Sequence, residues 1–113
     1  EERALKFAED VRDFVKTLQR TQSNSVYSVQ LLRSSSSVGA NYIEANDSLG
    51  KADFLMKAKT SRREARESTF WFRLIQTTND EKVNAERLRL LDEAHQFVRI
   101  FSAMIANTKT QKK

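Results

Sequence analysis

The chain has 113 residues, a formal net charge of +5, and neither cysteine nor proline. The lack of cysteine excludes disulfide frameworks, thiolate metal sites and thiol nucleophiles, and it suits a reducing, cytoplasmic compartment. With only two glycines, the chain has too few turn residues for the repeated hairpins of a β protein. A content of 31% charged and 39% hydrophobic residues is instead typical of amphipathic helices with solvated outer faces.

Apolar residues that recur every three or four positions predict four helices, over about residues 2–20, 26–47, 51–78 and 81–107. A basic tail, residues 108–113, is expected to fray. The predicted inner positions are Ala4, Phe7, Val11, Phe14 and Leu18 in the first helix, Leu31, Ser34, Val38, Asn41 and Ala45 in the second, Phe54, Ala58, Ser61, Ala65, Ser68, Phe72 and Ile75 in the third, and Leu91, Ala94, Val98, Phe101 and Ile105, widened by Leu90, Phe97 and Met104, in the fourth.

Four helices of this length joined by short loops predict one all-α domain over residues 1–113, an antiparallel up-down-up-down four-helix bundle. The sequence contains no internal repeat that would indicate a second unit. It also contains no run of about 18 apolar residues, so we expect no contact with a membrane interior.

The second helix is unusual because four serines and a glycine, residues 34–37 and 39, occupy its middle, where helix propensity disfavours them. Two arrangements remain open. Small side chains would let neighbouring helices approach closely, with the hydroxyls bonded to their own helix. Alternatively, buried polar groups need partners, so a polar network would join two helices. The members of that network would be Ser34, Asn41 and Glu44 of the second helix with Arg63, Glu64 and Glu67 of the third.

No arrangement of residues indicates an active site, and the chain is predicted not to be an enzyme. His95 is the only histidine, and with Asp92 it makes a single carboxylate-x-x-histidine unit, whereas a di-iron bundle needs two such units. Glu64 and Glu67 lie among arginines and are better explained as ion pairs than as an acid–base pair. We therefore expect no catalytic residue, no metal, no cofactor and no small-molecule substrate.

The positive charge is concentrated on the third helix, which carries seven basic residues and three acidic ones. A basic helix in a basic chain is the electrostatic footprint of a nucleic-acid binder, although arginine and lysine also fill solvated faces in any bundle. The residues predicted to contact RNA or DNA are Lys57, Lys59, Arg62, Arg63, Arg66 and Arg73.

Three consecutive aromatic residues at positions 70–72 cannot all enter one core, because they spread over about 200° of helix surface. We therefore predict that Phe70 and Trp71, with Tyr42 of the second helix, contact a second copy of the chain. The alternative is that they are partly covered aromatic side chains at helix edges.

Two segments resemble a known family. Residues 33–45, RSSSSVGANYIEA, are similar to a block of the bacterial 23S rRNA intervening-sequence proteins, and residues 53–57 and 59–74 resemble that family's third helix. The resemblance covers nearly the whole chain and implies an antiparallel four-helix bundle that assembles into homopentamers. Our first hypothesis is a homo-oligomer that binds RNA or DNA. Our second is a protein-interaction scaffold that binds no nucleic acid.

Overall fold

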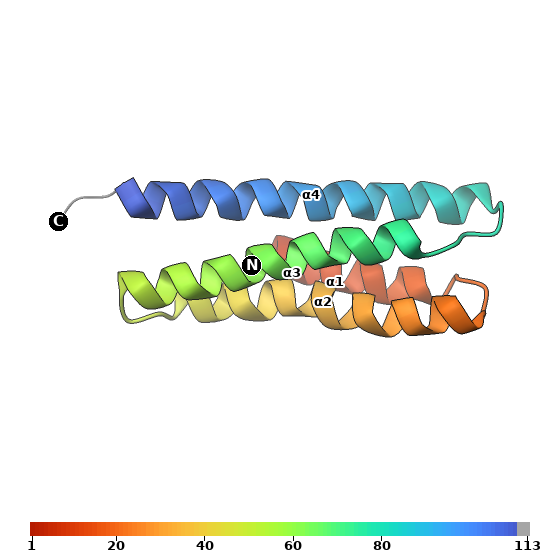
Figure 1. Ribbon diagram of the computed structural model, residues 1–113, viewed down its shortest axis with the longest axis horizontal. Coiled ribbons are helices and arrows are strands. Elements are labelled where there is room, and N and C mark those ends of the chain that lie inside the picture. Colours follow the sequence, from red (N-terminus) through yellow and green to blue (C-terminus); the bar gives the residue numbers. More distant parts are fainter. Residues whose placement is uncertain (111–113) are drawn as a thin grey trace.

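A computed structural model describes residues 1–110, which form the four helices α1 (Glu2–Val15), α2 (Gln22–Asn46), α3 (Lys51–Leu74) and α4 (Glu81–Thr110) (Figure 1). Successive helices run in opposite directions, and α1 and α3 each lie beside both α2 and α4. The diagonal pairs meet only through large side chains in the core. The bundle measures 54 × 21 × 18 Å. The prediction of an all-α four-helix bundle is therefore confirmed.

α1 is much shorter than the other three helices. Its first residue lies partway along the bundle, so α1 covers only the half that contains the loops before α2 and α4 (Figure 1). At the other half, α2, α3 and α4 pack as three helices. No helix within residues 1–110 has an apolar stretch long enough to cross a membrane.

The helix ends differ from the predicted ones because a buried asparagine ties two loops together. The amide nitrogen of Asn24 donates to the carbonyl oxygens of Gln19 (3.2 Å) and Gln76 (2.9 Å), and its amide oxygen accepts from the backbone N–H of Gln76 (3.1 Å). Asn24 is 2% exposed. These bonds hold the chain outside the helices at residues 19 and 76, so α1 ends five residues and α3 four residues before the predicted limits.

Side-chain caps start the helices on either side of these loops. Thr21 caps the N-terminus of α2, because its hydroxyl accepts from the backbone N–H of Asn24 (3.1 Å). α2 therefore begins at Gln22, four residues before the predicted start. Asp80 begins α4 by accepting from the backbone N–H groups of Lys82 (3.0 Å) and Val83 (3.1 Å). α4 then extends to Thr110, so residues 108–110 are helical rather than frayed, and residues 111–113 lie outside the described part.

The core is a row of aromatic side chains shared by α1, α3 and α4. The ring of Phe7 lies 5.3 Å from that of Phe97 and 6.4 Å from that of Phe72, measured between centroids. Most predicted inner positions are buried, but α4 turns a slightly different side inward. Leu90 and Phe97 are buried there, while Leu91, Val98 and Met104 are only partly buried and pack at the edge.

Small side chains let α2 lie close to both of its neighbours. On the α3 side, the Ser34 hydroxyl meets the Ser68 hydroxyl at 2.8 Å, and the Ser61 hydroxyl donates to the carbonyl oxygen of Val38 (3.1 Å). On the α1 side, a Cβ atom at Gly39 would lie 3.3 Å from the Cβ atom of Ala4. Close packing, one of the two arrangements left open by the sequence, is therefore present.

We predict that Gly39→Val destabilises the protein, because two further methyl groups would press on Ala4 and displace α1. The expected loss is about 1–3 kcal/mol in the free energy of unfolding, measured by urea denaturation. The matched control is Ala40→Val, whose side chain is exposed one position along α2 and should change the free energy by about 0.5 kcal/mol or less. Equal losses in both variants would contradict the close α1–α2 contact.

Candidate nucleic-acid interface

The acidic side chains of α3 are neutralised on the flank that faces α2. Arg33 of α2 donates to Glu64 (Nη1 to Oε1, 3.1 Å) and also to Glu67. The indole N–H of Trp71 donates to the same Glu67 carboxylate (2.9 Å). One arginine from the neighbouring helix thus compensates two of the three acidic residues of α3.

These bonds keep the Glu67 carboxylate ionised. Burial raises the pKa of Glu67, but the hydrogen bonds from Trp71 and Arg33 outweigh it, and the pKa lies below the ordinary value of 4.5. The hydrogen bond to Glu67 in turn raises the pKa of Arg33. The pair is partly exposed, with side-chain exposures of 46% for Arg33 and 32% for Glu67, so its contribution to stability is modest.

Lys57, which the sequence grouped with the nucleic-acid contacts, lies on the same flank as these acids. Its ammonium group forms an ion pair with Glu44 of α2, with Nζ 2.6 Å from Oε1. The hydrogen bond to Glu44 raises the pKa of Lys57. The structure therefore separates Lys57 from the other five predicted contacts.

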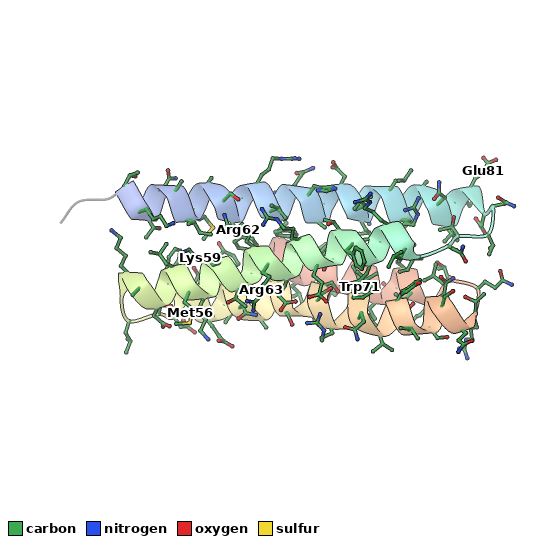
Figure 2. All side chains as sticks on the ribbon, in the orientation of Figure 1. Met56, Lys59, Arg62, Arg63, Trp71 and Glu81 are labelled. Atoms are coloured by element: carbon green, nitrogen blue, oxygen red, sulfur yellow. The ribbon has the colours of Figure 1, made fainter. Side chains whose placement is uncertain are left out.

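Those five residues lie together on the outer side of α3 and on its flank toward α4, and we call them the cationic face. Figure 2 shows Lys59 and Arg62 near α4, with Arg63 closer to the α2 side. Arg62 donates to the hydroxyl of Ser102 on α4 (3.2 Å). The full set is Lys59, Arg62, Arg63, Arg66 and Arg73.

In the described part of the chain, the cationic face forms no ion pairs with neighbouring acids, although the charge of Arg63 helps to lower the pKa of Glu67. Within residues 1–110, none of its five side chains has a carboxylate oxygen within 4.0 Å. The spacings of three and four residues from Lys59 to Arg66 place the charges on neighbouring turns of one helix. The face thus presents a row of uncompensated positive charge to solvent.

The predicted polar network is divided into separate groups. Ser34 pairs with Ser68, while the amide of Asn41 donates to the carbonyl oxygen of Ser37 in its own helix (2.9 Å). Glu44 pairs with Lys57, and Arg33 rather than Arg63 is the partner of Glu64 and Glu67. Arg33 was not among the predicted partners of Glu64 and Glu67, which were expected to interact with arginines of α3 or with the polar side chains of the second helix.

The three predicted oligomer contacts have different surroundings. Tyr42 meets Phe101 edge-on at a centroid distance of 5.5 Å, and Trp71 stacks on Tyr27 at 6.0 Å. Both are partly buried within the chain. Phe70 is 52% exposed, and its ring contacts Trp71 edge-on at 5.0 Å. Phe70 therefore leaves about half of its surface exposed to solvent, beside the cationic face.

A second surface, which the sequence analysis missed, carries exposed apolar side chains on α1 and α2. A shallow groove between these helices is lined by Leu5 and Leu32, with Ser35 and Ser36 beside them. Val29 is 63% exposed and Ile43 48%. Val29, Leu32 and Ile43 are separated by three and eleven residues, which places them on one side of a helix, so this spacing could have been found from the sequence. We call Leu5, Val29, Leu32 and Ile43 the apolar face.

Within residues 1–110 no three histidine, aspartate or glutamate side chains lie close enough together to hold a metal ion. His95 is exposed, and the nearby Asp92 accepts a hydrogen bond from Gln96 (2.7 Å).

Comparison with known proteins gives a consistent family assignment. The model of the 23S rRNA-intervening sequence protein family matches residues 1–103. The chain is also similar to the crystal structure of a protein of unknown function from the S23 ribosomal protein family of Bacteroides thetaiotaomicron, with 27% identity and a TM-score of 0.79. That likeness covers 92% of this chain and 95% of the other. No curated protein matches the sequence. The resemblance predicted from residues 33–45 and 53–74 is confirmed.

We predict that Glu67→Gln lowers the free energy of unfolding at pH 7 by about 1 kcal/mol or less, because it removes a partly exposed ion pair but leaves an acceptor for Trp71. Since the folded pKa of Glu67 lies below its ordinary 4.5, the stabilisation is present above that value and is lost as pH falls through the folded pKa.

Urea unfolding followed by Trp71 fluorescence at pH 7 and at a series of lower pH values measures this effect. The variant and the original protein should differ at pH 7 and converge as the pH is lowered. Asp92→Asn, which changes an exposed carboxylate in the middle of α4 that accepts from the neutral Gln96, is the control. A difference of the same size at all pH values would show that the charge of Glu67 does not stabilise the fold.

Proposed function

Because this chain belongs to the 23S rRNA-intervening sequence protein family, we propose that it is a non-enzymatic, homo-oligomeric bundle that binds RNA or DNA through the phosphates. The cationic face carries this proposal. Five cations lie on one side of α3 with no carboxylate oxygen within 4.0 Å of them in the described chain, while Glu64 and Glu67 are paired with Arg33 on the other flank. A face that only kept the protein soluble would not need this segregation of charge.

The dimensions of the face suit a single polynucleotide strand. Lys59 and Arg73 are fourteen residues apart on a continuous helix, which corresponds to about 21 Å along its axis. With one phosphate per strand every 3.4 Å or so of duplex axis, that length is matched by roughly six phosphates. The contacts are to the backbone, so binding depends strongly on salt and weakly on sequence.

The apolar face supports self-association. Leu5, Val29, Leu32 and Ile43 are exposed on α1 and α2, away from the α3 flank that carries the cations. Contact through this surface would remove apolar area from water without covering the cationic face. Five copies, the number that the family resemblance implies, would then present five cationic faces to one polynucleotide and raise its apparent affinity.

We predict that the triple variant Arg62→Gln, Arg63→Gln and Arg66→Gln binds nucleic acid more weakly, with the slope of log affinity against log salt reduced by about 2–3. Fluorescence anisotropy with a labelled ribosomal RNA fragment at several salt concentrations measures both quantities. Arg12→Gln, Lys16→Gln and Arg20→Gln, which remove equal charge from α1 and the loop after it, are the control and should leave most of the slope. If the cationic-face variant keeps the original slope, the phosphates do not bind there.

We also predict that Val29→Glu with Leu32→Glu reduces the mass of the particle, because two carboxylates would be buried without partners at the protomer contact. Light scattering after size-exclusion chromatography gives the mass, and circular dichroism checks that the helices persist. Leu88→Glu, at a side chain on α4 that is 48% exposed, is the control. An unchanged mass would place the contact elsewhere, and an oligomer that binds no nucleic acid at low salt would favour the protein-interaction scaffold.

A further inference from the structure

We infer that the cationic face binds single-stranded nucleic acid in preference to duplex, with the ring of Phe70 as a stacking platform for an unpaired base. This inference rests on the proposed function, and it assigns a class of nucleic acid to the same site. The observation behind it is an exposed aromatic ring among uncompensated arginines.

Phe70 lies within the row of charges. Arg66 is four residues before it and Arg73 three residues after it, so both are its neighbours on the helix surface, and Arg63 lies two turns before it. The ring is 52% exposed. A strand whose phosphates contact these arginines would therefore bring its bases within reach of the ring.

The ring is held in place from behind. Trp71 packs edge-on against Phe70 at 5.0 Å, and Trp71 is itself fixed by its hydrogen bond to Glu67 (2.9 Å) and by stacking on Tyr27 at 6.0 Å. Little side-chain freedom is then lost when a base stacks on Phe70, which favours binding. The contacts of Trp71 with Glu67 and Tyr27 thus restrict the position of the Phe70 ring that packs against it.

Single strands and duplexes would use this face differently. In a duplex the bases are stacked on one another, and a side chain on a straight outer helix meets phosphates and groove edges rather than a base face. An unpaired base can turn toward the ring and stack on it, and because every base has a π face this contact tolerates any sequence. RNA and DNA share this chemistry, so both are expected to bind.

The decisive measurement is fluorescence anisotropy with three labelled probes: a 12-nucleotide oligouridylate, a 12-nucleotide oligothymidylate and a 12-base-pair DNA duplex. We expect the original protein to bind the single strands roughly tenfold more tightly than the duplex. Phe70→Leu should lose most of that preference and keep its duplex affinity and salt slope, while Phe70→Tyr should retain the preference.

Met56→Ala is the matched control, because Met56 is an exposed apolar residue near the start of the same helix, far from Trp71, the neighbour of Phe70 in sequence (Figure 2). Its affinities should stay within about twofold of the original ones. Light scattering is recorded for every variant, and dissociation of the particle by Phe70→Leu would make Phe70 a protomer contact and overturn the inference.

The two proposals fail in different ways. Equal affinity for duplex and single strands, or a preference unchanged in Phe70→Leu, would overturn the stacking role while leaving the cationic face as a phosphate-binding surface. Absence of salt-dependent binding to all three probes would overturn the proposed function itself and the inference with it.

Discussion

The close contact between α2 and α3 determines where the charges of this protein lie. Ser34 and Ser68 bond to each other across the contact, and Ser61 bonds to the backbone of α2, so only small side chains fit between the two helices. These contacts fix the rotation of α3 about its own axis. Glu64 and Glu67 then fall on the flank that Arg33 can reach, together with Lys57, and the cationic face lies outside this flank.

Periodicity was sufficient to predict the fold because burial of apolar surface is the dominant force and repeats with the helix. Phe7, Val11 and Phe72, all predicted to be inner residues, are fully buried. The helix ends could not be predicted in the same way. They depend on Asn24, whose amide reaches loops that are distant in sequence and competes with helical hydrogen bonds for their backbone groups.

The residues of the candidate site could also be predicted from the sequence, but their ion-pair partners could not. Helical spacing identifies neighbours within α3, whereas Arg33 and Glu44 act from α2 and depend on how the two helices are aligned. Lys57 and Arg63 look equivalent in the sequence, yet within the described residues Lys57 forms an ion pair with Glu44 and Arg63 forms none. Whether a basic side chain has an acidic partner therefore depends on how the helices pack, and the number of charged residues does not reveal it.

The row of cations on α3 works against the stability of its own helix. Lys59 and Arg63, like Arg62 and Arg66, are four residues apart, and each such like-charge pair destabilises a helix by roughly 0.2–0.5 kcal/mol. Neighbouring charges on adjacent turns lie closer together than the Debye length of about 8 Å at physiological salt, so small ions screen this repulsion only in part. A strand of phosphates laid along the face would remove it. Polyanion binding and helix stability should therefore be coupled at this surface, which a merely solvated face would not require.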